Sequence, residues 1–189
     1  MTLDSKGSVG GIAILWNPTE VVVDLWIGMR RILSVRFRMI GHKDWFLVSM
    51  VYGPHILIER EAFLTQMLRL SNLHTEKLWV IARDFNMITT TTEKKRGLQW
   101  EDAYMERFRE TQTTLQLIDI NTINGKYTWN NRRGGSRQIA SILDRFLATE
   151  NFLGKDLLYQ AKILPCQGSD HWPIKLEIAM NNQNQHKPF

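Results

Sequence analysis

The strongest constraint on the fold is a regular alternation of apolar and polar residues in residues 33–39. Leu, Val, Phe and Met occupy the odd positions of this segment, and Ser, Arg and Arg occupy the even positions. Successive side chains of a strand point to opposite faces, so the pattern predicts a strand with one buried and one solvated face. Residues 11–16, 21–26 and 45–52 are also predicted strands, and the last is apolar on both faces, as in the centre of a sheet. Turn-forming residues separate these segments, which together predict an antiparallel meander.

A helix is predicted after Pro54, because Phe63, Met67 and Leu70 have the i, i+4, i+7 spacing of one helical face. A second helix is predicted over residues 102–115, where apolar residues recur on one side. Many strands with few helices between them predict an α/β or α+β sandwich, in which two packed sheets have helices outside. The remaining predicted strands cover residues 78–82, 118–120, 127–129, 142–148, 161–164 and 174–180.

Length and composition indicate one domain. The chain has 189 residues, of which 43% are hydrophobic, and this is enough for a sizeable core. We predict that residues 1–180 form the domain and that residues 181–189, rich in Asn and Gln, form a disordered tail. The single cysteine, Cys166, has no Cys or His neighbour at zinc-ligand spacing and is predicted to be a buried thiol. The sequence lacks a long apolar run and a signal-peptide pattern, so we expect an intracellular monomer, nuclear or cytoplasmic, with no membrane partner.

Positive charge favours a polyanionic partner such as DNA or RNA. The formal net charge is +5, and Lys and Arg bind phosphates by displacing condensed counterions. The cations cluster in residues 94–96 and at Arg132, Arg133 and Arg137, in segments that read as loops. Two interpretations remain open: solvated loop charge, or phosphate contacts to which Trp129 adds base stacking. Trp129 itself has the alternative interpretation of a core aromatic.

Two polar tripeptides follow predicted strands and carry groups able to hydrolyse a phosphodiester. They are Asp84-Phe85-Asn86 and Ser169-Asp170-His171. Such hydrolysis needs an in-line nucleophile, a group that accepts its proton, and positive charge near the developing oxyanions. A carboxylate, a histidine and Mg²⁺ supply these, and Mg²⁺ prefers oxygen ligands. Either tripeptide alone has a simpler explanation, because Asp and Asn at strand ends commonly shape turns.

Together with other short motifs, these tripeptides resemble the endonuclease/exonuclease/phosphatase superfamily, and most closely the endonucleases of plant non-LTR retrotransposons of the LINE type. The resemblance covers about residues 7–178. It rests on these motifs in this order: Gly10-Gly11-Ile12-Ala13-Ile14-Leu15-Trp16, Val51-Tyr52-Gly53-Pro54, Asp84-Phe85-Asn86, Tyr127-Thr128-Trp129, Leu143-Asp144-Arg145-Phe146 and Ser169-Asp170-His171.

The resemblance implies a four-layered α/β sandwich of two packed, mainly antiparallel sheets flanked by helices. It also implies hydrolysis of DNA phosphodiester bonds that depends on Mg²⁺ or Mn²⁺, at one end of the paired sheets. The implied catalytic residues have different roles. His171 would act on the scissile phosphate, and Asp144 would orient His171. Asp84 would activate water, and Asn86 would hold that water or a transition-state oxygen. Tyr52 would contact the phosphate, and Asp170 would help to hold the metal.

The chain also departs from the family pattern. Members begin with a strand that carries an Asn, followed by a helix and a strand that ends in a metal-binding Glu, and the sequence before Gly10 matches neither. The small residues that usually precede the Asp84 motif are replaced by Ala82 and Arg83. Arg83 should favour the charged form of Asp84 and so reduce its basicity. We therefore expect a truncated domain that lacks its first strands and helix, binds metal weakly and is weakly active or inactive.

Two alternatives to this hypothesis stay open. The first is a remnant that binds nucleic acid without cleaving it, and its binding should weaken with salt. The second is a phosphomonoesterase of the same superfamily, because one fold can serve several substrates.

Overall fold

A six-stranded sheet forms the centre of the computed structural model, which describes residues 1–5, 10–73, 78–97 and 102–180. The strand order is β3-β4-β5-β6-β11-β8, and neighbouring strands are antiparallel except β5 and β6. The predicted meander is therefore confirmed for β3-β4-β5 but not for residues 11–16, which lie outside this sheet. The predicted tail 181–189 lies outside the described residues. The bounds are β3 Val21–Met29, β4 Ile32–Met39, β5 Phe46–Tyr52, β6 Trp79–Asp84, β8 Leu117–Asp119 and β11 Asp144–Thr149.

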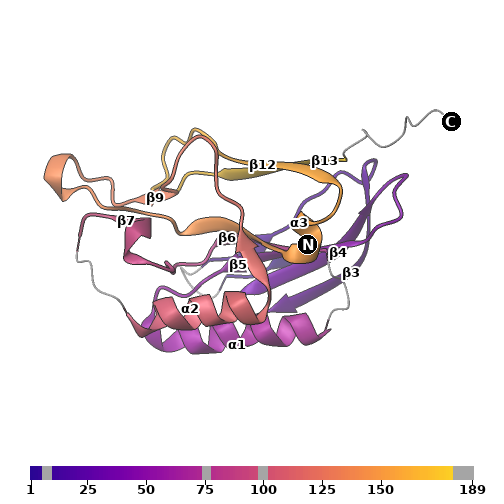
Figure 1. Ribbon diagram of the computed structural model, residues 1–189, viewed down its shortest axis with the longest axis horizontal. Helices are drawn as coiled ribbons and strands as arrows, with labels where there is room; N and C mark the ends of the chain where they lie inside the picture. The colour runs from indigo at the N-terminus through magenta and orange to yellow at the C-terminus, as the bar shows by residue number, and fades with distance from the viewer. Residues whose placement is uncertain (6–9, 74–77, 98–101, 181–189) are drawn as a thin grey trace.

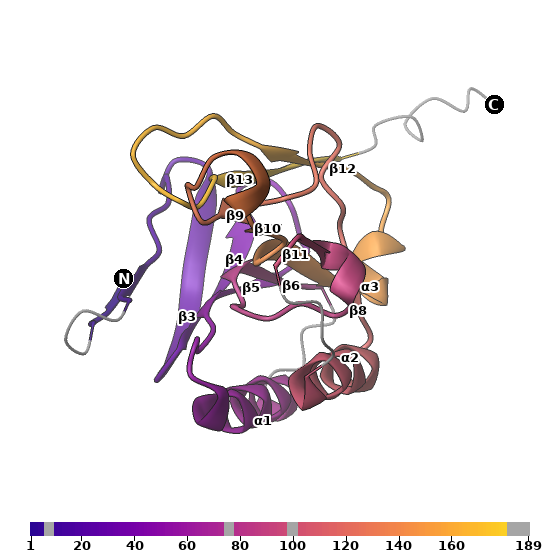
Figure 2. The same cartoon turned by 90° about the vertical axis from the view of Figure 1, so that its left-hand side faces the viewer.

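Two helices, α1 (Leu57–Leu73) and α2 (Ala103–Thr114), lie side by side on one face of this sheet (Figures 1 and 2). Helix α1 forms the crossover between the parallel strands β5 and β6, which a short turn cannot connect. Its predicted apolar face is buried at Phe63, Met67 and Leu70. The Asp102 carboxylate caps α2 by accepting hydrogen bonds from its first turn, so this helix begins where it was predicted.

The opposite face of the sheet packs against a second, two-stranded sheet of β12 (Leu157–Ile163) and β13 (Ile174–Met180) (Figure 1). The short helix α3 (Glu150–Leu153) places Phe152 in this second core. The predicted α/β sandwich, with sheets packed together and helices outside, is thus confirmed. No helix among the described residues is long and apolar enough to cross a membrane.

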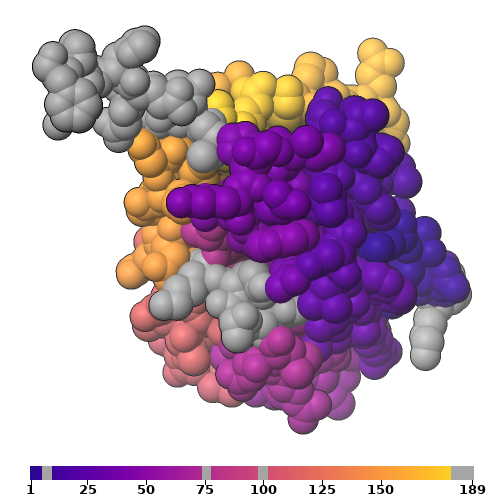
Figure 3. Space-filling view, turned by 90° about the vertical axis from the view of Figure 1, so that its right-hand side faces the viewer, coloured from indigo at the N-terminus to yellow at the C-terminus, as the bar shows by residue number. Residues whose placement is uncertain are grey.

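Short strands complete the structure. Near the N-terminus β1 (Thr2–Leu3) pairs with β2 (Ile12–Ala13), so the strand predicted over residues 11–16 is only two residues long. Figure 3 shows the N-terminal part of the chain from β1 through β4, coloured indigo to purple, forming much of one side of the molecule. A small sheet with the order β7-β10-β9 lies on the left of Figure 1. It includes Lys94–Lys95, which was predicted as loop. Its strands are β7 Lys94–Lys95, β9 Trp129–Asn130 and β10 Ala140–Ser141, and the 3₁₀ turns nearby are η1 Thr91–Glu93 and η2 Gly135–Arg137.

Candidate active site

Three residues implicated by the sequence lie in one row across the central sheet. Tyr52 is the last residue of β5 and pairs with Asp84, the last residue of β6. Asp84 in turn lies directly opposite Asp144, the first residue of β11. Opposed residues of antiparallel strands have Cα atoms only about 4.5–5.5 Å apart. The pairing register therefore places two carboxylates side by side at one end of the sheet.

The turn after Asp84 is held in place by close backbone contacts. The Gly53 N–H donates to the Asp84 carbonyl at 2.7 Å, and the Asn86 side chain donates to the Gly53 carbonyl at 2.9 Å. A Cβ on Gly53 would lie 1.9 Å from the Phe85 carbonyl oxygen, so only glycine fits there. Asn86 also donates to both Asp84 carboxylate oxygens at 2.9 Å, from its backbone N–H and from its side-chain amide. These contacts fix the direction of the Asp84 carboxylate.

His171 reaches the two carboxylates from the segment between β12 and β13. Its Nδ1 is 2.8 Å from Asp144 Oδ2, and its Nε2 is 4.0 Å from Asp84 Oδ2. The second distance is too long for a hydrogen bond. One possible ligand atom from each of these three side chains lies within 4.8 Å of the others. Segments 84, 144 and 171, far apart in the sequence, thus meet at one point.

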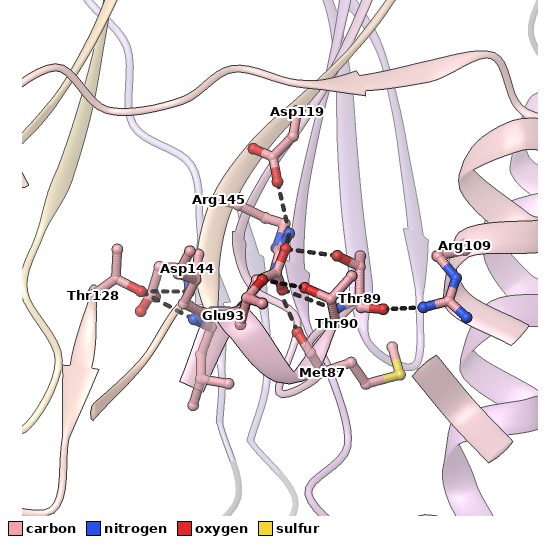
Figure 4. A network of polar contacts seen from close by, with 12 residues as sticks. Met87, Thr89, Thr90, Glu93, Arg109, Asp119, Thr128, Asp144 and Arg145 are labelled. Atoms are coloured by element: carbon pink, nitrogen blue, oxygen red, sulfur yellow. Dashed lines mark hydrogen bonds and ion pairs between the residues drawn. The ribbon is translucent and has the colours of Figure 1, made fainter. Parts of the chain in front are cut away.

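Thr128 supports this cluster, although sequence reasoning gave it no role of its own. Its buried hydroxyl oxygen accepts hydrogen bonds from the backbone N–H groups of Leu143 and Asp144, at 3.0 and 2.9 Å (Figure 4). The hydroxyl therefore helps to fix the start of β11. A threonine inside the Tyr127-Thr128-Trp129 motif was the available signal, because a buried hydroxyl requires hydrogen-bond partners.

The surroundings of Asp84 and His171 raise the pKa values of both groups. Burial, and next the negative charge of Asp144, raise the pKa of Asp84 to about 6. The charge of His171, the Asn86 N–H and the charge of Arg83 oppose this rise only in part. Burial disfavours the charged form of His171, but the hydrogen bond and the charge of Asp144 outweigh it and raise the His171 pKa. Near neutral pH, Asp84 is therefore a carboxylate that is more basic than an ordinary aspartate. It lies beside the His171 imidazole, which is more readily protonated than an ordinary histidine.

Asp170 lies outside this tight group. It is exposed, and its Oδ2 accepts a hydrogen bond from the Trp129 indole at 2.9 Å. This bond, acting against a small effect of burial, lowers the pKa of Asp170. Trp129 is half-buried and is not among the buried hydrophobic residues of the core, so the interpretation of this residue as a core aromatic is wrong. The indole instead links β9 to the loop that carries His171.

A pocket of about 660 Å³ joins these groups. Its walls include Tyr52, Asp84, Asp144, Asp170 and His171, and no glutamate is present among its described lining residues. Cys166 also lines the pocket and is partly exposed, so the prediction of a buried thiol is wrong. Arg83 lies in the same wall, where its side chain is exposed.

The basic clusters are brought together by the small sheet β7-β10-β9. Lys95 pairs with Ala140, and the Arg96 guanidinium donates to the Gly135 carbonyl. Arg132, Arg133 and Arg137 are exposed in the segment between β9 and β10. The Asn130 N–H, at the end of β9, donates to the Asp170 carbonyl at 3.0 Å, so this segment approaches the pocket. Clusters separated by over thirty residues thus form one surface beside the candidate site.

Comparison with known proteins identifies the fold. No protein-family model and no curated protein matches the chain. Among solved structures, the endonuclease domain of TRAS1, a telomere-specific non-LTR retrotransposon, is similar over 96% of this chain and 79% of its own, with a TM-score of 0.72 and 18% identity. An endonuclease/exonuclease/phosphatase family protein of Bacteroides thetaiotaomicron is similar over 86% of this chain and 67% of its own, with a TM-score of 0.54 and 14% identity. The mannosyl-6-phosphatase Bt3783 of the same organism matches 87% of this chain and 69% of its own, with a TM-score of 0.55 and 14% identity. The chain therefore has the fold of the endonuclease/exonuclease/phosphatase superfamily.

Proposed function

We propose that this protein is a phosphodiester hydrolase of the endonuclease type, derived from a retrotransposon endonuclease and acting on DNA or RNA. The observation that carries the proposal is the convergence of Asp84, Asp144 and His171 within 4.8 Å. These groups supply a base, an orienting carboxylate and a cation, which is the set that hydrolysis of a phosphodiester needs. The fold shared with the TRAS1 endonuclease domain supports the same reaction class.

In this proposal, Asp84 accepts the proton of the attacking water. A base is most effective when its pKa lies close to the working pH, and the raised pKa of Asp84, about 6, meets this condition. Asn86 holds the carboxylate in one orientation and positions the water or a phosphate oxygen. His171, oriented by Asp144, stabilises negative charge on the phosphate as a cation. Tyr52, half-buried in the same wall, contacts the phosphate.

The pocket also suits a divalent cation, Mg²⁺ or Mn²⁺. Burial and the repulsion from Asp144 raise the pKa of Asp84, which indicates a site with too little positive charge for its carboxylates. Asp170, which lines the same pocket, would help to hold the ion through a carboxylate oxygen, as such ions prefer. The bound ion would supply positive charge to the developing oxyanions. Because the described lining contains no glutamate, we propose weak metal binding and a weakly active or inactive enzyme.

The surface formed by the basic segments supplies the nucleic acid contacts in this proposal. Arg132, Arg133 and Arg137 neutralise phosphates, while Trp129, half-buried beside the pocket, contributes an aromatic edge for a base.

Nicking of supercoiled plasmid DNA with and without Mg²⁺ tests the proposal. We expect slow nicking that depends on Mg²⁺ and is lost in His171→Ala. His42→Ala is the matched control, because His42 lies beyond the far end of β5 from Tyr52. Nicking that His171→Ala leaves unchanged would contradict the assigned site. Nicking as fast as that of an intact nuclease would contradict weak activity.

Two other outcomes would favour the alternatives. Binding of oligonucleotides that weakens with salt, without any cleavage, would indicate a binding protein, which the exposed arginines favour. Release of phosphate from small phosphomonoesters, with DNA left uncut, would indicate a phosphatase, as the likeness to a mannosyl-6-phosphatase suggests.

A further inference from the structure

A buried arginine next to Asp144, the orienting carboxylate, has partners on the side of the sheet away from the pocket. Arg145 follows Asp144 on β11 and is only 3% exposed. Its guanidinium donates to Glu93 Oε2 and to Asp119 Oδ2, both at 2.6 Å, and to the Ile142 carbonyl at 3.0 Å (Figure 4). The Phe108 ring of α2 lies against it, 5.7 Å from the guanidinium carbon to the ring centroid. Arg145 therefore connects β11, β8 and the turn η1.

Glu93 is held on its other side as well. Its carboxylate accepts hydrogen bonds from the Thr89 backbone N–H at 2.8 Å and from the Thr89 hydroxyl at 2.6 Å. Its backbone carbonyl accepts from the Ile142 N–H at 3.0 Å. Burial opposes ionisation, but the hydrogen bond and the charge of Arg145 outweigh it and keep the pKa of Glu93 below its ordinary value. The pair is thus an ion pair near neutral pH, with both partners fixed by several contacts.

The position of Glu93 in the chain gives this ion pair its significance. The next residues, Lys94 and Lys95, form β7, and Arg96 follows. Strand β7 pairs with β10, and Arg96 bonds to Gly135, so Glu93 lies at the base of the surface that carries both basic clusters. We call residues 94–96 and 132–137 the basic arm. The ion pair with Arg145 therefore ties the base of this arm to β11, one residue from Asp144.

A purely stabilising role does not account well for this arrangement. Buried ion pairs recover little of their desolvation cost, and apolar residues in their place are often neutral or stabilising. The Arg145 Nε is moreover one of the buried polar atoms that lack a hydrogen-bond partner among the described residues. What the pair does supply is a fixed, directional link between two segments, because a guanidinium bonds a carboxylate in a defined geometry.

We propose that Glu93, held by Arg145, is a positioning residue that fixes the basic arm beside the Asp84–Asp144–His171 cluster, so that phosphates bound by the arm enter the site in register. This inference rests on the proposed binding of nucleic acid. It assigns to a buried acidic residue a role in holding a polyanion.

The variant Glu93→Gln tests the inference because charge alone predicts the opposite result. Removing a negative charge makes the protein more basic, which should strengthen polyanion binding. Glu110→Gln is the matched control, since it makes the same charge change at an exposed site on α2. Binding of a fluorescent single-stranded oligonucleotide is measured at several salt concentrations for the wild type and both variants. We expect Glu110→Gln to bind as tightly as the wild type or more tightly. We expect Glu93→Gln to bind on the order of tenfold more weakly, with a salt dependence reduced by about one or two phosphate contacts.

The outcomes separate this inference from the proposed function. Wild-type protein that shows no salt-dependent binding would overturn both. Wild-type binding, with Glu93→Gln as tight as Glu110→Gln, would overturn only the positioning role. If circular dichroism shows that Glu93→Gln is unfolded, Thr89→Val replaces it, because this variant removes one hydrogen bond to Glu93 without changing any charge. Binding by Thr89→Val equal to the wild type, in slope and in affinity, would then contradict the inference.

Discussion

Replacing Asp84 with Asn should stabilise the protein while abolishing hydrolysis. Asp84 is 5% exposed, and its pKa is raised from 3.8 to about 6. One pH unit corresponds to about 1.4 kcal/mol, so the ionised carboxylate destabilises the fold by about 3 kcal/mol at neutral pH. Asn has the same shape without charge, but its amide nitrogen would face the Asn86 amide and lose a hydrogen bond, which costs about 1 kcal/mol. The expected net gain in unfolding free energy is about 2 kcal/mol at pH 7.

The stability difference between Asp84→Asn and the wild type should depend on pH in a direction set by the raised pKa of Asp84. Well below pH 3.8, Asp84 is protonated in the folded and in the unfolded state, so its ionisation does not affect the stability of the wild type. Between pH 4 and pH 6, the unfolded state releases this proton before the folded state does, and the wild type loses stability as the pH rises. The Asn variant lacks this loss. Its advantage should therefore be absent at pH 4, grow through this window and stay constant above about pH 7.

Urea denaturation of both proteins at several pH values between 4 and 8 measures the difference. Asp24→Asn is a control of opposite sign, because the hydrogen bond from Arg36, acting against slight burial, lowers the pKa of Asp24. That carboxylate adds stability above about pH 4, so the Asp24 variant should be the less stable one at neutral pH. If Asp84→Asn were no more stable than the wild type at pH 7, with a difference unchanged down to pH 4, the argument from burial and like-charge repulsion would be refuted.

Three further variants probe the same end of the sheet. Arg83 has a φ of 98°, which costs a non-glycine residue about 1–3 kcal/mol, so Arg83→Gly should raise the melting temperature by a few degrees; an unchanged or lower value would argue against strain. Gly53→Ala should destabilise the protein by about 1–3 kcal/mol in urea denaturation because of the clash with the Phe85 carbonyl, and a neutral effect would contradict that close approach. Asp144→Asn should lower the pKa of His171, seen by NMR titration of the imidazole, because it removes the charge that outweighs burial; an unchanged pKa would contradict the orienting role.

Local patterns were sufficient for most of the fold. The alternation in residues 33–39 predicted β4, and the spacing of Phe63, Met67 and Leu70 predicted α1, because each pattern follows from burying one face of one element. Strand β7 was missed because Lys94–Lys95 has no apolar residue and depends on its pairing with β10. Strand β12 begins four residues earlier than predicted, at Leu157, because Leu158, Tyr159 and Gln160 are exposed and so show no alternation.

The sequence could predict which residues gather at the site but not how they are arranged. The motifs indicated Asp84, Asp144 and His171 as one group, whereas the direct opposition of the two aspartates depends on the β6–β11 register, which no local pattern specifies. The network of Glu93 and Arg145 was missed as well. The available signal was an arginine inside the apolar run 142–148, because a charge within a buried strand must find partners elsewhere in the chain.

Two unfavourable features of this protein meet at one end of its central sheet. Asp84 carries a buried charge next to that of Asp144, and Arg83 adopts a positive φ immediately before it. By contrast, local pattern and structure agree at the apolar face of α1 and at the cap of α2. Folding alone gives no reason to hold two carboxylates together in this pocket, since an amide in place of Asp84 would be more stable. Local conflicts of this kind are expected where a structure is adapted to bind or transform a ligand, so the energetics point to the same residues as the motifs do.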